Sequence, residues 1–518
     1  MSKREQERQQ LYSTIWGIAN KLRGSIDGWD FKQYVLGIIF YRYISENLLN
    51  YINEGEHKSG NKNFDYIKLT DKESQKIKED IIKSKGFFIL PSELFENVFK
   101  KAEHDENLNT TLENIFKNIE ASANGTKSDE DFRGLFEDID VNNKKLGSTV
   151  KERNKKLLAL LEGVNEMKLG NYQDNTIDAF GDAYEFLMGM YASEAGKSGG
   201  EYFTPQEVSE LLARITVVGK KKIGKVYDPT VGSGSLLLKF AKILGKGNIQ
   251  GFYGQEKNLT TYNLCRINMF LHDISYEDFN IKHGDTLLEP LHLNEIPFEA
   301  IVSNPPYSIN WEGKKNATLI NDPRFSPAGI LAPESKADFA FIMHSLSHLA
   351  SNGVAAIVCF PGILYRSGAE QKIRKYLVDN NFIDCIIQMP SNLFFGTSIA
   401  TCIMVLKKNK ENVNDVLFID ASKECNKVTN SNKLSETNIE TILNTFKDRK
   451  EKKHFSKRVK INEIAEQDYS LSVNTYVEIE DKKEIIDIKV LNKEIDEITK
   501  KCDSLRKDIK KIIKEIEG

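Results

Sequence analysis

Short runs of β-branched and aromatic residues alternate with helix-like stretches through the middle of this chain, and this alternation constrains the fold most. The runs are residues 224–227, 249–253, 300–303, 354–360, 383–388 and 400–406. Strands that alternate with helices form an α/β fold, a mostly parallel sheet with helices on both faces. Ligands of such sheets bind at the carboxyl ends of the strands, so functional residues are expected there.

The regions on either side of this alternation are predicted to be helical. Residues 1–165 carry apolar side chains at helical spacing, including the long apolar stretch Phe31–Tyr43. Nothing in this region suggests chemistry, which favours a packing or docking domain. At the other end, apolar residues follow one another in alternating steps of three and four: Ile488, Leu491, Ile495, Ile498, Cys502, Leu505, Ile509, Ile512 and Ile516.

This spacing is typical of a coiled-coil seam. It predicts a C-terminal heptad helix over 481–518 that docks on another subunit; a contact with its own domain is the alternative. The 518 residues therefore divide into three predicted domains, at 1–165, 166–480 and 481–518, which fits a length too great for one ordinary core. After Leu406 the chain has little room for a separate domain that recognises a target.

Charge and cysteine content narrow the class of protein. The 72 basic and 75 acidic residues leave a net charge of −3, whereas a protein that grips DNA alone usually has a basic face. Lysine clusters at 220–222, 407–408 and 447–460 fit either solvated surface or phosphate contacts.

Six cysteines without a CxxC pair argue against a disulfide framework or a metal site. With neither a membrane-spanning run nor a signal-like N-terminus, a cytoplasmic protein is expected.

The first strand leads into a glycine turn that suits a small charged ligand. Its sequence is Asp228-Pro229-Thr230-Val231-Gly232-Ser233-Gly234-Ser235, followed by an apolar helical stretch. Such a turn brings backbone N–H groups close to a ligand, although it is often only a tight connection. A pyrophosphate needs no carboxylate beside it, so Asp228 favours a zwitterionic ligand with a cation, as in S-adenosylmethionine.

Two further acids follow later strand ends in the order that an adenosine-containing ligand requires. Glu256 is placed to accept both ribose hydroxyls, and Asp285 could receive the adenine amino group. Each acid alone is more often a capping residue or part of a solvated turn. The three in order, with Gly232, Ser233, Gly234 and Ser235, predict a cofactor pocket for S-adenosylmethionine.

The fourth strand runs into Asn304-Pro305-Pro306-Tyr307, which is predicted to be the catalytic centre. Two prolines make the turn rigid and remove two N–H donors. If the Asn304 amide oxygen and the Pro305 carbonyl each accept a hydrogen from an exocyclic amine, its lone pair localises and can attack a methyl group. Tyr307 would stack on the base. The alternative is a rigid surface turn.

Upstream, Thr204 followed by Pro205 is expected to cap a helix. In these motifs the chain resembles the modification subunits (HsdM type) of type I restriction–modification systems, which are S-adenosylmethionine-dependent N6-adenine DNA methyltransferases. The resemblance covers nearly the whole chain, including Tyr34–Ile44 and Leu393–Thr397. It implies that the cofactor pocket also includes the following residues: Glu201, Tyr202, Phe203, Thr204, Pro205 and Gln206.

The resemblance also implies partners and leaves some alternatives open. It implies two such chains on one specificity subunit that reads the DNA sequence, joined by a restriction subunit for cleavage. The resemblance leaves open whether Phe394 or Phe395 helps to hold a flipped adenine, or whether these side chains belong to the apolar core. RNA adenine and the glutamine amide of proteins are alternative substrates, and a scaffold subunit without activity is the alternative from another class.

Overall fold

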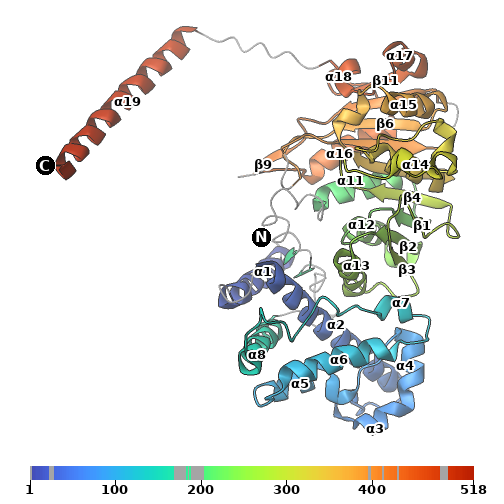
Figure 1. Ribbon diagram of the computed structural model, residues 1–518, viewed down its shortest axis with the longest axis vertical. Coiled ribbons are helices and arrows are strands. Elements are labelled where there is room, and N and C mark those ends of the chain that lie inside the picture. Colours follow the sequence, from blue (N-terminus) through green and yellow to red (C-terminus); the bar gives the residue numbers. More distant parts are fainter. Residues whose placement is uncertain are drawn as a thin grey trace. The chain divides into compact units, whose positions relative to one another are not determined.

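The computed structural model describes residues 3–22, 28–167, 183–184, 186–187, 204–394, 398–410, 413–428, 431–478 and 488–517 (Figure 1). The chain forms two compact units, Met1–Val477 and Glu478–Gly518. The predicted boundaries at 165 and 480 stay predictions. Among the described residues, no helix combines the length and the apolar character needed to cross a membrane.

A nine-stranded sheet forms the centre of the first unit, in the order β11-β8-β6-β7-β5-β4-β1-β2-β3. Only β7 and β11 run antiparallel to their neighbours; the other pairings are parallel, which confirms the predicted α/β fold. The strands are β1 Ile223–Asp228, β2 Ile249–Glu256, β3 Phe279–His283, β4 Phe298–Ser303, β5 Leu349–Cys359, β6 Ile383–Gln388, β7 Cys402–Lys407, β8 Asp415–Asp420 and β11 Ser456–Lys460. A separate hairpin joins β9 Asn426–Val428 to β10 Ser431–Lys433.

Helices cover both faces of this sheet. Alternate side chains of one strand enter different apolar clusters, as Val226 and Tyr227 of β1 do, which is the pattern of a sheet buried on both faces. The helices of this region are α11 Gln206–Thr216, α12 Ser235–Leu244, α13 Leu259–Leu271, α14 Asp338–His348, α15 Ala369–Asp379, α16 Glu436–Asp448, α17 Ile461–Glu466 and α18 Val473–Tyr476. The stretch after Leu406 thus completes the sheet with β8 and β11 and forms no separate target-recognition domain among the described residues.

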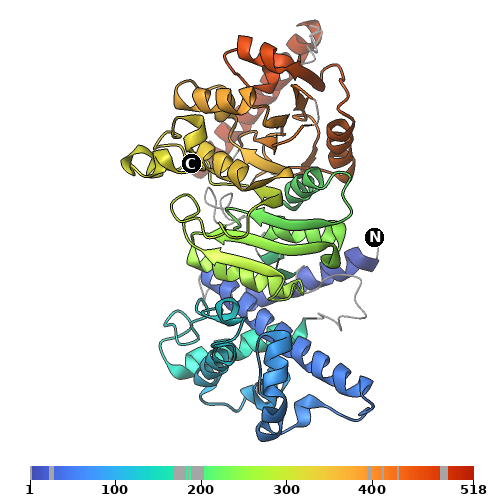
Figure 2. The same cartoon turned by 90° about the vertical axis from the view of Figure 1, so that its right-hand side faces the viewer.

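The N-terminal region is helical, as predicted (Figure 2). Its centre is α2, whose side chains are buried almost continuously from Tyr34 to Ile44. A helix that is apolar on all sides must be surrounded by other elements. The helices are α1 Lys3–Leu22, α2 Gly28–Lys58, α3 Asp71–Ser74, α4 Lys78–Lys85, α5 Phe95–Ala102, α6 Leu108–Ser122, α7 Asp129–Phe132 and α8 Val150–Glu166.

A buried arginine joins this helical region to the sheet. Arg266 of α13 is 1% exposed, and its guanidinium donates to the carbonyls of Glu130, Asp131 and Arg133 at 2.8, 3.1 and 3.0 Å. The guanidinium also lies over the Tyr262 ring, 4.2 Å from its centre. Because each carbonyl would otherwise lack a donor in an apolar setting, the contact fixes α13 to α7 and its C-terminal cap residue.

The second unit contains one long helix, α19 Ile488–Glu517, which confirms the predicted C-terminal helix. Five apolar side chains of the heptad spacing are 45–63% exposed: Leu491, Ile495, Ile498, Leu505 and Ile509. Cys502 is exposed as well. The side chains of Ile488, Ile512 and Ile516 lie outside the described residues. The coiled-coil pairing of this helix stays a prediction.

Candidate functional site

The predicted acids and the Asn304 turn meet at one edge of the sheet. In the parallel register Asp228 lies beside Gly254 and Tyr227 beside both Tyr253 and Ile301, so β1, β2 and β4 end together. Since β3 is parallel to β2, the segment before Asp285 ends at the same edge. The topology therefore brings the three acids and the Asn304 turn together, as the strand pattern predicts.

The turn between β1 and α12 is closed tightly against α13. Gly232 and Gly234 have φ of +55° and +81°, a region that glycine occupies without strain. A Cβ on Gly234 would lie 2.9 Å from the Cys265 sulfur, so a larger residue does not fit. The Ser233 carbonyl accepts a hydrogen bond from the Asn268 amide at 2.7 Å. Ser233 and Ser235 are both buried, and the backbone of the turn is held in one conformation.

Asp228 keeps one carboxylate oxygen unused. Its Oδ1 accepts the Thr230 N–H at 2.9 Å, whereas the buried Oδ2 has no hydrogen-bond partner among the described residues. The residue is only 1% exposed, and this burial raises the pKa of the Asp228 carboxyl to about 8. A buried carboxylate without a partner is costly, so this oxygen is the natural place for a cationic group of a ligand.

Glu256 is fixed before any ligand arrives. Its two carboxylate oxygens accept the Gly232 N–H at 3.0 Å and the Asn258 N–H at 2.8 Å. Burial raises the pKa of Glu256, against the lowering effect of these N–H groups. Each oxygen retains a second lone pair, so the carboxylate can still accept two ligand hydroxyls. The contact also ties the end of β2 to the glycine turn after β1.

Asp285 is partly exposed, whereas Asp228 is buried. One oxygen accepts the Leu287 N–H at 3.0 Å, and the other lies 2.8 Å from the Lys257 ammonium. This is the capping arrangement that a single acid at a turn often has. Free lone pairs remain for an amino group, so the adenine contact predicted for Asp285 stays a prediction.

The Asn304 amide is held by two side chains. Its nitrogen donates to the Thr204 hydroxyl at 3.0 Å, and its oxygen accepts the Tyr307 hydroxyl at 2.6 Å. Burial raises the pKa of Tyr307 well above its ordinary value, which keeps the phenol protonated as a donor. Pro305 is buried and Pro306 half-buried. Tyr307 thus occupies one of the two lone pairs of the oxygen that is predicted to accept an adenine hydrogen.

Thr204 does not cap a helix, so that prediction is wrong. Helix α11 begins at Gln206, and its cap residue Pro205 offers no side-chain hydrogen bond. The Thr204 hydroxyl contacts Asn304 because the end of β4 lies beside it. Both polar atoms of the Gln206 amide are buried without a partner among the described residues. Glu201, Tyr202 and Phe203 lie outside the described residues.

Two further predictions concern the aromatic residues Phe394 and Phe395 and the lysine clusters. Phe394 is buried in the apolar core, which matches the core alternative for that residue, while Phe395 lies outside the described residues. Lys220–Lys222 precede β1, and Lys407 ends the antiparallel strand β7. These lysines therefore lie at the edge of the sheet opposite Asn304, away from the predicted site.

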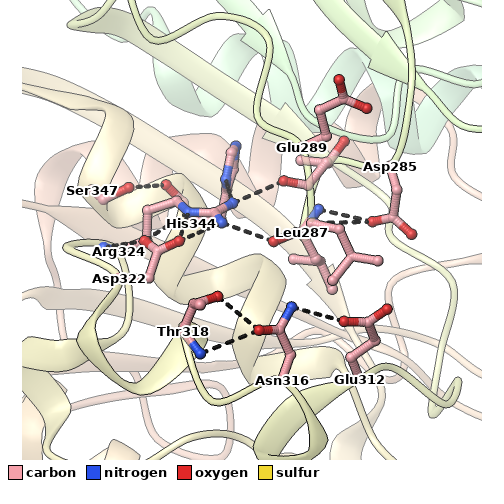
Figure 3. A network of polar contacts seen from close by, with 12 residues as sticks. Asp285, Leu287, Glu289, Glu312, Asn316, Thr318, Asp322, Arg324, His344 and Ser347 are labelled. Carbon is pink, nitrogen blue, oxygen red and sulfur yellow. Dashed lines mark hydrogen bonds and ion pairs between the residues drawn. The ribbon is translucent and has the colours of Figure 1, made fainter.

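A network of buried polar contacts links the turns of this edge, and the sequence pattern does not indicate it. The Arg324 guanidinium donates to the carbonyls of Thr286 and Leu287, both at 2.8 Å. Figure 3 shows Arg324 between the Leu287 turn, Asp322 and His344; it lies 2.7 Å from the Asp322 carboxylate and 3.2 Å from the His344 ring. The Thr286 hydroxyl donates to the Pro229 carbonyl at 2.6 Å. The segment after Tyr307 thus braces the turns that carry Asp228 and Asp285.

This fold, with acids after β1 and β2 and an Asn-Pro-Pro-Tyr turn after β4, defines an S-adenosylmethionine-dependent methyltransferase of the class that acts on planar amines. The family model described as "N-6 DNA Methylase" matches residues 175–485, and the one described as "HsdM N-terminal domain" matches residues 11–164. The chain belongs to the family of methylase subunits of type I restriction enzymes, which are N6-adenine DNA methyltransferases.

Individual relatives are similar to this chain over nearly its full length. The chain is 53% identical to the type I restriction enzyme MpnII methylase subunit of Mycoplasma pneumoniae, over 99% of this chain and 97% of that protein. It is 30% identical to the MjaVII methylase subunit of Methanocaldococcus jannaschii, over 93% and 80%. The methyltransferase subunit of a type I restriction–modification system from Streptococcus thermophilus superposes with a TM-score of 0.82 at 36% identity, covering 91% of this chain and 99% of that one.

Proposed function

We propose that this edge of the sheet methylates the N6 amino group of adenine in a specific DNA sequence, with S-adenosylmethionine as methyl donor. The observation that carries the proposal is the Asn304 amide, fixed by Thr204 at 3.0 Å beside the acids of β1 and β2. Modification of this kind protects host DNA from the cleavage activity of the same system. RNA adenine and protein glutamine are the alternative substrates.

The residues present fit the proposed cofactor. The unpartnered Asp228 oxygen suits the ammonium of its methionine part, and the two oriented Glu256 oxygens suit the ribose hydroxyls. Asp285 and the Gln206 amide supply further polar groups, and Gly232, Ser233, Gly234 and Ser235 expose backbone close to the ligand. S-adenosylmethionine supplies an electrophilic methyl group on a sulfonium.

Catalysis by this chain consists of orienting the adenine amine. The Asn304 oxygen and the Pro305 carbonyl each accept one N6 hydrogen, which localises the nitrogen lone pair and directs it to the methyl group. Tyr307 donates its hydroxyl hydrogen to one lone pair of the Asn304 oxygen at 2.6 Å, and the base can use the second lone pair or displace this donor. The Tyr307 ring then stacks on the adenine.

Methyl transfer from labelled S-adenosylmethionine tests this proposal. Asn304→Ala is expected to lose at least 100-fold in kcat, as expected when a group that acts only in the transition state is removed, while cofactor affinity stays within about twofold. Asn118→Ala, on the exposed face of α6, is the matched control. DNA, RNA and protein acceptors are compared in parallel, and transfer to RNA or protein but not to DNA would contradict the proposed substrate.

We also propose that α19 docks on a specificity subunit, with two copies of this chain on one such subunit and a restriction subunit added for cleavage, in the cytoplasm. Two observations support a partner subunit that contributes to DNA binding. One is the net charge of −3, and the other is the exposed apolar seam of Leu491, Ile495, Ile498, Leu505 and Ile509. Deletion from Ile488 onward is expected to abolish co-purification of the partner with cofactor affinity unchanged. Equal loss of both would refute the docking role.

A further inference from the structure

The residue that follows the Asn304–Tyr307 turn has a strained backbone. Ser308 has a φ of +51°, in the left-handed region that residues with a Cβ rarely occupy. A residue stays there only where its surroundings hold it, and such strain gathers at functional sites. Since Ser308 is bonded directly to Tyr307, its conformation sets the direction in which the chain leaves the turn.

Asp338 holds Ser308 in this conformation. The Ser308 N–H donates to both carboxylate oxygens of Asp338, at 3.3 and 3.2 Å. Asp338 is 5% exposed, so water competes little for these oxygens. The neighbouring Ala337 N–H donates to the Ile309 carbonyl at 3.0 Å, which gives the segment after the turn a second attachment to the start of α14.

The helix that carries Asp338 is itself anchored. Asp338 is the first residue of α14, and His344 of the same helix lies 3.0 Å from the Tyr227 hydroxyl and 3.2 Å from the Arg324 guanidinium. Burial lowers the pKa of His344 well below its ordinary value, so the ring is neutral and can accept from Arg324. The carboxylate is therefore mounted on an element that is fixed to β1.

We propose that Asp338 is a positioning residue for the methyl transfer. By keeping Ser308 left-handed, it aims the Asn304–Tyr307 turn at the substrate amine. This inference rests on the proposed function. A simpler role is possible for an acid in the first turn of a helix, where it stabilises the positive end of the helix dipole. That role would change stability but not the rate of methyl transfer.

Replacement of Asp338 combined with a glycine at 308 separates the two roles. Asp338→Ala in the complex that co-purifies with this chain is expected to lower kcat about tenfold, the factor that matches the cost of an unsupported left-handed residue. Equilibrium binding of labelled S-adenosylmethionine stays unchanged. Adding Ser308→Gly, which accepts positive φ freely, is expected to bring kcat back to within about threefold of wild type.

Two controls accompany these variants. Ser308→Ala keeps the Cβ and is expected to give no rescue of Asp338→Ala. Asp384→Asn removes an equally buried carboxylate paired with Arg449 at 2.8 Å, at the opposite edge, and is expected to lower stability with kcat unchanged. If Asp338→Ala does not fold, Asp338→Leu, which is of similar size but offers no acceptor oxygen for the Ser308 N–H, takes its place in the same series.

Different outcomes of these experiments would overturn the positioning role of Asp338 and the proposed methylation of DNA. A wild-type complex that methylates DNA, together with a fully active Asp338→Ala, overturns the positioning role alone. The same follows if glycine and alanine at 308 rescue equally, or if cofactor affinity falls in parallel with kcat. A wild-type complex that transfers no methyl group to DNA overturns the proposed function and this inference with it.

Discussion

Binding of S-adenosylmethionine should release a proton from Asp228. Burial raises the pKa of this carboxyl to about 8, against about 4 in an unfolded chain. At pH 7 the ligand-free carboxyl is therefore about 90% protonated, and pairing with an ammonium requires it to ionise. We expect about 0.9 protons to be released per cofactor at pH 7 and affinity to rise close to tenfold from pH 6 to pH 7.

Replacement of Asp228 by asparagine changes binding and stability in opposite directions. The amide cannot ionise, so proton release is lost and cofactor affinity falls by about 2–3 kcal/mol, roughly 30- to 150-fold, as for a buried charge pair that loses one partner. In the wild type the folded-state pKa lies above the unfolded value. Stability of the cofactor-free protein therefore falls as pH rises from about 4 to about 8. Asp228→Asn lacks this loss and should have the higher Tm at pH 8.

Calorimetric titration in two buffers of different ionisation enthalpy counts the released protons, and thermal unfolding at pH 6 and pH 8 measures the stability effect. Asp384→Asn serves as the control for loss of a buried carboxylate away from the site. Wild-type binding at pH 7 without proton release, together with normal affinity of Asp228→Asn, would refute the assignment of Asp228 as the ammonium partner.

Three further variants test the contacts of the site. Tyr307→Phe removes the donor that competes with the base for the Asn304 oxygen, so the KM for DNA in steady-state methylation should fall about two- to fivefold at unchanged kcat; a tenfold drop in kcat would contradict this. Thr204→Ala should lower kcat about five- to tenfold with cofactor affinity retained, and Thr204→Ser should restore it; parallel loss of affinity would indicate a cofactor contact instead. Arg324→Met leaves the half-buried Asp322 carboxylate and the buried carbonyls of Thr286 and Leu287 without their donor and should lower the free energy of unfolding by about 3 kcal/mol, whereas an unchanged denaturation midpoint would exclude the bracing role.

The strand ends are readable from the sequence because burial on both faces produces short apolar runs with acids or turns after them. The run 383–388 coincides with β6, and the predicted acids and the Asn304 turn lie at the expected edge. Strands β3, β8 and β11 of the sheet are not among the predicted runs. The apolar run 416–419 is as long as the predicted run 300–303, so β8 could have been predicted, whereas β11 is largely exposed with two of five residues buried.

The contacts within the site depend on how distant segments meet, which periodicity does not encode. Thr204 and Asn304 are 100 residues apart, and the sequence around Thr204 fits a helix cap as well as any other role. Asp338 begins an otherwise apolar stretch, and that isolated charge is the one signal that could have pointed to it, since buried acids occur where a specific partner needs them. Arg266, within the apolar helix α13, carries the same kind of signal.

The Arg266 contact limits how this enzyme can move. A hinge between the N-terminal helices and the sheet at α13 would strip a buried guanidinium of the three carbonyls at 2.8–3.1 Å, a cost of several kcal/mol. Thermal fluctuations seldom supply that much, so a force applied to the N-terminal helices is transmitted through α13 without bending there. Because α13 starts just after Glu256, a displacement of the helical region moves Glu256, the acid proposed to bind the ribose, together with it.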